Sequence, residues 1–297
     1  MAYVLIVASA LLISSQFIFQ AQYQKSEGND LRSSMFFSFF VYLLQAVVMV
    51  AYIFIRGQVP GFTPFSALLA FAFAASALGI SYVAVKGLAI GDVALFSLFN
   101  MLGSMLLPSL YGIIFAQEGV SVPKAVCIVL VIAALLVECK PTAAYDRRAV
   151  KYYIAAFLFN GTCATLLAVH QSRPDKNVST ESFLLLCAVA AVLLSGLFLG
   201  AIALGARKHG DSSQALRFPH VQSILWSSGY SVVNVGGNLL AMIAMLSLPA
   251  SVQFPILTGG SIVFTTVFSK LMKNKLGVAH YVAVLLSVAA TIVIIWA

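Results

Sequence analysis

Residues 182–206 read SFLLLCAVAAVLLSGLFLGAIALGA, which is a run of 25 residues without a charged side chain. As an α-helix this run is about 37 Å long, more than the roughly 30 Å hydrocarbon core of a bilayer. A helix satisfies its backbone hydrogen bonds within one segment, whereas a membrane β-strand would alternate apolar and polar residues. The run therefore predicts a membrane-spanning helix.

The rest of the chain repeats this pattern, with apolar runs separated by short segments rich in Gly, Pro, Asn and charged residues. The 297-residue chain is 61% hydrophobic and only 9% charged, against about 25% charged in soluble domains. We therefore expect an all-α membrane protein of ten transmembrane helices, with no sizeable soluble domain. The ten runs cover residues 2–24, 34–55, 65–86, 91–116, 122–138, 150–170, 182–206, 222–246, 250–270 and 278–296.

The longest charged stretch, residues 138–151, divides the runs five and five. Residues 84–137 can be placed on residues 241–294 at a shift of 157 residues, so that Gly103 falls on Gly260. Because five is odd, the second copy must cross the bilayer in the opposite sense to the first, as in many secondary transporters. We expect two inverted five-helix repeats and a linker, at residues 1–140 (first repeat), 141–149 (linker) and 150–297 (second repeat).

The passage between the third and fourth runs resembles a known family. Residues 82–94 read YVAVKGLAIGDVA, which is similar to the alanine-rich passage between the third and fourth helices of the drug/metabolite transporter superfamily, in particular its EamA-like ten-helix members. Glu118 stands where that family often has a glutamate opening the next loop, whereas the second copy has Lys275 there. The resemblance implies inverted repeats and transport of a small molecule, but no particular substrate.

Neutral polar residues recur at helical spacing within several runs. In the eighth run Trp226, Tyr230, Asn234 and Asn238 follow one another every four residues, so they share one helix face. An amide facing lipid would leave its hydrogen-bonding groups unsatisfied, at a cost of roughly 2–7 kcal/mol. These faces must therefore point toward other helices or a cavity. Four other runs have similar stripes, formed by Gln16, Gln20 and Gln24, by Tyr42 and Gln45, by Ser97, Asn100 and Ser104, and by Asn160, Cys163 and His170.

Two interpretations of the stripes are open. The amides can join neighbouring helices directly, at roughly 0.6–2 kcal/mol each, or they can converge on one polar chamber. Stripes on five separate runs favour the chamber. We expect the substrate to be bound by polar groups and two apolar walls, Tyr82 and Trp226, and the full set of expected site residues is Gln20, Tyr82, Asn100, Asn160, Trp226, Tyr230, Asn234 and Asn238.

Carboxylates are missing from the middle of the runs, since Asp92, Glu118 and Glu181 all lie near run ends. A chamber without acidic groups suits a small neutral or zwitterionic metabolite, for example an amino acid, better than a cationic drug. We therefore expect a secondary transporter or facilitator that works by alternating access. We do not expect an enzyme, and we expect neither catalytic residues nor a metal or cofactor site.

Two other functions stay open. One is an exchanger of phosphorylated metabolites or nucleotide-sugars, for which Lys86, His170 and Lys270 would supply the cations. The other is a non-transporting membrane scaffold or lipid-handling protein, whose polar stripes would be sealed against each other. The expected partners are a small-molecule substrate and the lipid bilayer but no nucleic acid, and the sequence leaves homodimer formation open.

The net charge of +8 belongs mostly to the segments between runs, where Lys and Arg meet lipid head groups. If the amino terminus is cytoplasmic, 13 of the 17 Lys and Arg residues lie in outer loops, so the positive-inside rule favours the reverse orientation. The resembling superfamily usually has both termini in the cytoplasm. Orientation therefore stays open, and we expect a multi-pass protein of a bacterial inner (cytoplasmic) membrane.

Overall fold

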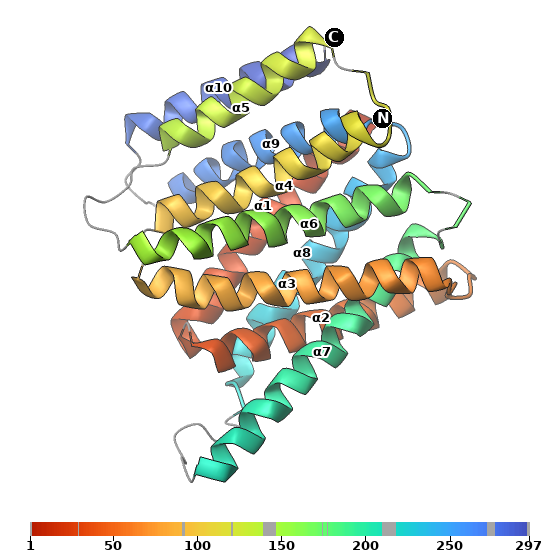
Figure 1. Ribbon diagram of the computed structural model, residues 1–297, viewed down its shortest axis with the longest axis vertical. Helices are drawn as coiled ribbons and strands as arrows, with labels where there is room; N and C mark the ends of the chain where they lie inside the picture. The colour runs from red at the N-terminus through yellow and green to blue at the C-terminus, as the bar shows by residue number, and fades with distance from the viewer. Residues whose placement is uncertain are drawn as a thin grey trace.

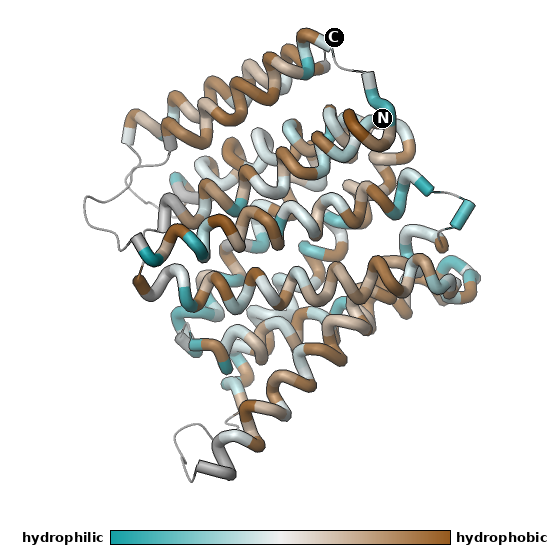
Figure 2. The backbone as a smooth tube through the Cα atoms, viewed as in Figure 1, coloured by the Kyte–Doolittle hydropathy of each residue, from teal (hydrophilic) through white to brown (hydrophobic). Residues whose placement is uncertain are grey.

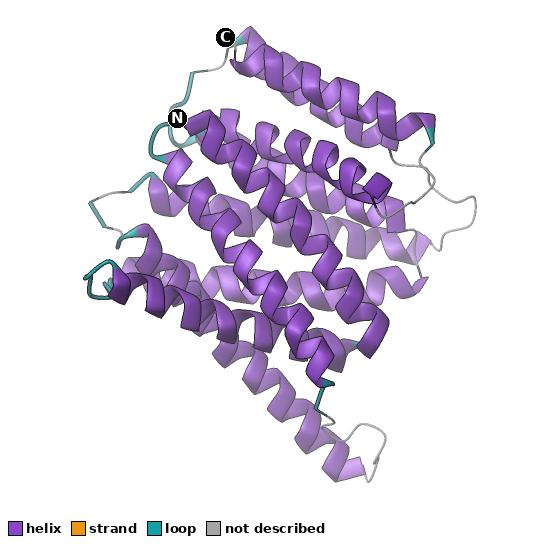
Figure 3. Cartoon of the chain, turned by 180° about the vertical axis from the view of Figure 1, so that it is seen from behind, coloured by secondary structure: helices purple, strands orange, loops and turns teal. Residues whose placement is uncertain are grey.

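Helices are the only regular secondary structure in the part of the chain that the computed structural model describes (Figure 3). Asp92, Lys275 and most of the expected linker lie outside that part. The described residues are 2–28, 30–90, 93–119, 121–138, 147–173, 175–176, 178–209, 218–271 and 277–295.

Ten α-helices form within the described residues, and each corresponds to one expected run with ends displaced by at most four residues. The expected all-α fold of ten helices is confirmed. The helices are α1 (Ala2–Glu27), α2 (Leu31–Ile55), α3 (Pro64–Ile90), α4 (Val93–Ile114), α5 (Val122–Glu138), α6 (Val150–Gln171), α7 (Thr180–His209), α8 (Val221–Met245), α9 (Ala250–Leu271) and α10 (Val278–Ile295), with a 3₁₀ turn, η1 (Arg147–Ala149), before α6.

Seven of the described helices are long and apolar enough to cross a membrane, namely α1, α2, α3, α4, α6, α7 and α9. They indicate a multi-pass integral membrane protein. Helices α5 and α10 have shorter apolar stretches of about 24 and about 26 Å, less than the thickness of a typical hydrocarbon core. Helix α8 is not among the seven, and serines and asparagines interrupt its apolar sequence.

The turn between α1 and α2 shows how the sequence sets helix ends. Gly28 adopts a φ of +82°, a conformation that glycine takes without steric cost, and it follows the last residue of α1. The Asp30 carboxylate then accepts a hydrogen bond from the backbone N–H of Ser33 (3.4 Å) and caps α2. The Tyr23 hydroxyl donates to the Ser33 carbonyl oxygen (3.1 Å), which ties the turn back to α1.

Helices distant in sequence pack together. Helix α1 packs mainly on α8 and also on α9, while α6 packs on α4 and α3. The α5–α10 pair lies at one edge of the molecule and α7, packed on α2 and α3, lies at the other (Figure 1). Hydrophobic residues run along these edge helices, whereas hydrophilic residues occur at helix ends and along the helices between them (Figure 2). The polar groups within the membrane region are thus kept in the centre.

Both chain termini lie at the same end of the bundle, where α1 begins and α10 ends (Figures 1 and 3). We call this end the terminus side and the other end the opposite side. The α1–α2 turn is on the opposite side, and the α4–α5 loop is on the terminus side.

Glycine allows helices α4 and α6 to approach each other very closely. A methyl group on Gly103 of α4 would collide with the backbone carbonyl of Phe157 in α6. One on Gly161 of α6 would lie 2.8 Å from the Gly103 carbonyl oxygen. Small residues at such crossings let two backbones pack in van der Waals contact, which drives helix association in lipid.

The α4–α6 crossing makes Gly103→Ala a test of the packing. Because the colliding atom belongs to the backbone of α6, the new methyl group can be accommodated only by moving a helix, and we expect about 1–3 kcal/mol of destabilisation. Gly200→Ala in α7 is the control, since nothing lies within 4 Å of the added group. Reversible unfolding of both variants in mixed detergent micelles measures the difference, and equal stability would contradict the close crossing.

Candidate functional site

A chamber of about 480 Å³ lies between α1, α2, α3, α4, α6, α8 and α9. Its polar lining side chains come from every one of these helices. They include Gln16, Gln20, Gln24, Ser38, Tyr42, Ser81, Ser97, Asn100, Ser104, Asn160, Cys163, Tyr230, Asn234, Asn238, Thr258 and Ser261. Residues from each of the five expected polar stripes therefore meet around one space, whereas Gln45, His170 and Trp226 of those stripes do not line it.

The structure brings six of the eight expected site residues together in this lining, namely Gln20, Asn100, Asn160, Tyr230, Asn234 and Asn238. Helices α1, α4, α6 and α8 carry them. The stripe on α1 continues as the spacing predicted, since Gln16 and Gln24 accompany Gln20.

The other two expected residues, Tyr82 and Trp226, do not line the chamber. Tyr82 follows Ser81, which does line it, and the rotation of about 100° per residue in a helix directs Tyr82 outward, where it is 45% exposed. Trp226 lies one turn before Tyr230, but it packs on Phe19 of α1 with ring centroids 6.3 Å apart. Residues spaced four apart are rotated by about 40° around the helix axis at each step. The first and last members of the Trp226 to Asn238 stripe therefore point in different directions.

One wall of the chamber is a chain of amides joining α1 and α8. The side-chain N–H₂ of Asn234 donates to Gln16 Oε1 (2.7 Å), and that of Asn238 donates to the Asn234 backbone oxygen (2.9 Å) and to Asn234 Oδ1 (3.1 Å). The bonds fix the orientation of the Asn234 side chain. This wall is pre-organised before any solute enters.

The facing wall is formed by α4 and α6. The Asn160 side chain donates to the backbone oxygen of Asn100 (2.8 Å), a bond made beside the close crossing at Gly103. Asn100 Oδ1 is buried and has no hydrogen-bond partner among the described residues. A buried oxygen without a donor is costly, and because the Asn100 side chain lines the chamber, a rotation that turns this oxygen toward the space would let a bound solute or water satisfy it.

Aromatic rings complete the lining. Phe37 of α2 meets the ring of Tyr230 edge to face, with centroids 4.9 Å apart, and Phe73 of α3 lies on the same chamber. The chamber therefore has two amide walls separated by aromatic and aliphatic surface. Such a mixture of a few polar groups in an apolar cavity is typical of small-molecule sites.

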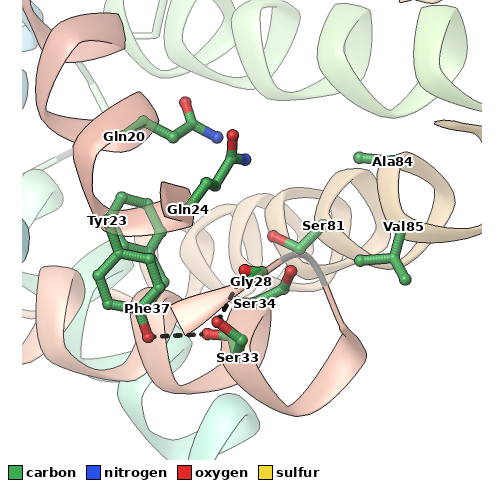
Figure 4. A pocket seen from close by; sticks show the side chains of 10 residues that line it. All are labelled: Gln20, Tyr23, Gln24, Gly28, Ser33, Ser34, Phe37, Ser81, Ala84 and Val85. Atoms are coloured by element: carbon green, nitrogen blue, oxygen red, sulfur yellow. Dashed lines mark hydrogen bonds between the residues drawn. The ribbon is translucent and has the colours of Figure 1, made fainter. Parts of the chain in front are cut away.

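The chamber has a mouth on the opposite side. A smaller cavity of about 210 Å³, the vestibule, is bounded by the α1–α2 turn and the end of α3. Figure 4 shows Gln20 and Gln24 of α1 extending across it toward Ser81 and Ala84 of α3. The vestibule and the chamber share these four residues and Phe37, so the two cavities adjoin.

The terminus side of the chamber is closed by a hydrophobic floor. We define the floor as the cluster in which Ala250, Phe254 and Leu257 of α9 and Met245 of α8 pack on Tyr111, Ala164 and Ala168 of α4 and α6. Phe254 is only 4% exposed and Ala168 only 5%. The chamber therefore opens toward the opposite side and ends at the floor.

Sequence reasoning did not find the contributions of α3 and α9. Phe73 and Ala77 on α3 and Leu257 and Thr258 on α9 line the chamber. These are apolar or small residues, and nothing in their spacing distinguishes a chamber wall from ordinary helix packing. His170 was expected on the α6 stripe, but its ring stacks on Phe183 of α7 at 3.8 Å between centroids and does not line the chamber.

The fold occurs in a solved structure. A crystal structure of a protein matches 98% of this chain with 95% of its own, at a TM-score of 0.77 and 16% sequence identity. No family model and no curated protein sequence matches the chain. At this identity the likeness establishes the arrangement of the helices and carries no information on activity.

The chamber makes Cys163 a probe of water access. Cys163 lines the chamber, whereas Cys127 and Cys187 are buried away from it, so a small water-soluble thiol reagent should modify Cys163 before these two. Ser81→Trp fills the vestibule and should slow that reaction, while Tyr82→Trp, one residue further on the outer face, should not. Peptide mass spectrometry after timed labelling measures both. Equal rates in the two variants would mean that the vestibule is not the route into the chamber.

Proposed function

We propose that this protein is a secondary transporter or facilitator of a small neutral or zwitterionic metabolite, such as an amino acid. The observation that carries the proposal is a single chamber with amides from four helices, open on the opposite side and closed on the terminus side. A carrier needs such a site between its halves, reached from one side at a time. Amides that only join neighbouring helices need no enclosed space.

The lining supports an uncharged or internally balanced substrate. Among the described lining residues there is no Asp, Glu, Lys, Arg or His. A lone ion brought into this site would lose its hydration without meeting an opposite charge, which is costly in a low-dielectric interior. A zwitterion or a neutral polar solute can replace water by hydrogen bonds to amides, and the chamber volume lies within the usual range for small-molecule sites.

Asn100 Oδ1 favours a substrate that carries an N–H or O–H donor. When the side chain turns this buried oxygen toward the chamber, a substrate donor gains a hydrogen bond and removes an unsatisfied group at the same time. The Asn234–Asn238 wall faces it and can bind the substrate's remaining polar atoms. An amino acid has donors and acceptors at one end and an apolar part that suits Phe37 and Phe73.

The helix contacts support two inverted repeats and, with them, the drug/metabolite transporter resemblance. In the expected repeat, α1 corresponds to α6, α3 to α8 and α4 to α9. The α1–α8 pair then corresponds to the α6–α3 pair, and the α4–α6 pair corresponds to the α9–α1 pair. All four of these pairs pack together. Gly103 and Gly260, matched in sequence, lie at the α4–α6 and α9–α1 crossings, facing Phe157 and Ala10. In such a carrier all ten helices would cross the bilayer, including the polar α8 and the short α5 and α10.

The two other functions receive less support. Lys86 and Lys270 are exposed and His170 packs on Phe183, so these cations do not reach the chamber that a phosphorylated substrate would occupy. A scaffold or lipid-handling protein would have its polar faces sealed against each other. The chamber between α1–α8 and α4–α6 favours transport over both.

The proposal also gives an orientation in a bacterial inner membrane. The loops on the opposite side carry most of the Lys and Arg residues, so the positive-inside rule places the vestibule in the cytoplasm and both termini outside. A tag at either terminus should therefore be accessible to an impermeant reagent in intact spheroplasts. Labelling only after the membrane is permeabilised would show that both termini are in the cytoplasm.

Asn234 and Asn100 test the binding site. A thermal-shift screen of the purified protein against neutral and zwitterionic metabolites should first give a stabilising ligand. Asn234→Leu and Asn100→Leu should then each weaken its binding roughly tenfold, because each removes a hydrogen bond of about 1.4 kcal/mol, and both should reduce uptake into proteoliposomes. Tyr82→Leu, outside the chamber, is the control. Wild-type affinity and uptake in both asparagine variants would exclude these residues from the site.

A further inference from the structure

The α4–α5 loop directs one carboxylate onto the start of α9. Glu118 Oε1 accepts a hydrogen bond from the backbone N–H of Ala250 (2.8 Å), and Glu118 Oε2 accepts one from Ser251 (2.9 Å). The first N–H groups of a helix have no partner within it, and the helix dipole favours a negative charge there. Both oxygens of one carboxylate are therefore used in charge-assisted hydrogen bonds.

The loop is built to hold Glu118 in this position. Gln117 has a φ of +54°, an unfavourable conformation for a residue with a side chain, and the Glu118 N–H donates to the Gly112 carbonyl oxygen (3.0 Å). Gly112 also gives the carboxylate its space, since a Cβ there would lie 2.7 Å from the carboxylate oxygens. The chain thus turns back on α4 to present Glu118 to α9.

The contact crosses the closed end of the chamber. Helix α4 belongs to the wall that it forms with α6, whereas α9 packs both on α4 and on α1, which belongs to the facing wall. Just inside the contact lies the floor, where Ala250 and Phe254 pack on Tyr111. A second bond joins the two walls nearby, from the Gln171 side chain of α6 to the Met242 carbonyl oxygen of α8 (3.1 Å).

A similar carboxylate at the other end of the molecule makes a different kind of contact. Glu27 Oε1 accepts hydrogen bonds from the His220 backbone N–H (2.7 Å) and the Ser223 hydroxyl (2.7 Å) at the start of α8. Helices α1 and α8 form one wall and pack along each other extensively. The Glu27 contact therefore lies within one wall, whereas the Glu118 contact holds the end of α4 to α9, the helix that packs on both walls.

We propose that Glu118 is the latch of the closed end, and that its contact with α9 breaks when the chamber opens to the terminus side. The inference rests on the proposed transport function. The first turn of α9 also contains two buried oxygens, Ser251 Oγ and Gln253 Oε1, that have no partner among the described residues. Opening would give both of them water, so the closed end carries a cost that the Glu118 bonds offset. The state closed on the terminus side and the state open there are thereby close in free energy and can exchange.

Spin-label distances test the latch without any substrate. One pair of labels replaces Phe115 and Leu246, exposed residues at the ends of α4 and α8 on the terminus side. A second pair replaces Ile90 and Val221, exposed residues of α3 and α8 on the opposite side. Double electron–electron resonance in nanodiscs then reports the two ends of the chamber. The background has serine in place of the four native cysteines, Cys127, Cys139, Cys163 and Cys187.

Glu118→Gln should raise the ratio of long to short distances on the terminus side roughly tenfold, because it removes a charge-assisted contact from one state only. The opposite-side distances should shorten at the same time. Glu27→Gln is the matched control and should leave the terminus-side distances unchanged. Unchanged terminus-side distances in Glu118→Gln, or the same change in both variants, would overturn the latch.

Ala250→Pro is the second variant and decides the question if Glu118→Gln does not fold. It removes one donor of the contact but keeps the carboxylate, and proline is well tolerated in the first turn of a helix. The ratio should change in the same direction, and an unchanged ratio would contradict the proposal. Because the readout needs no transport, shifted distances in a protein that moves no solute would count against the proposed function and leave the latch intact.

Discussion

An amide side chain inside a bilayer must find partners within the protein, because lipid offers none. This constraint explains why Asn100, Asn160 and Asn234, on three different helices, face one space. The apolar runs determine that the chain crosses the membrane, but they leave the rotation of each helix free. The amides fix that rotation, and they do so by converging. The chamber, its walls and the exclusion of lipid from the centre all follow from this convergence of the amides.

The chamber differs strongly between its two ends. On the opposite side Gln20 and Gln24 border a vestibule that adjoins the chamber. On the terminus side Phe254 packs on α4 and α6, and Glu118 joins the loop after α4 to the start of α9. A site that opens at one end and is packed closed at the other is what the proposed alternating-access cycle requires of one state.

The sequence predicted the ten helices closely because apolar run length is a strong signal in lipid. It also placed six chamber residues, since amides at intervals of about four residues must share an inward face. It failed for Tyr82 and Trp226, because an aromatic ring is equally stable against lipid, an interface or another helix. Helix α9 escaped detection for a related reason, since Leu257 and Thr258 carry no cost that would reveal their direction.

A density map of the protein in a lipid nanodisc, at a resolution that orders individual solvent molecules, tests the central claim most directly. We predict ordered solvent or solute density within hydrogen-bond distance of Asn100 Oδ1, between that residue and Asn234. Direct contact of the α4–α6 wall with the α1–α8 wall, with no density between the amides, would contradict the account. The stripes would then be joints between helices, and the chain would have no site for a transported solute.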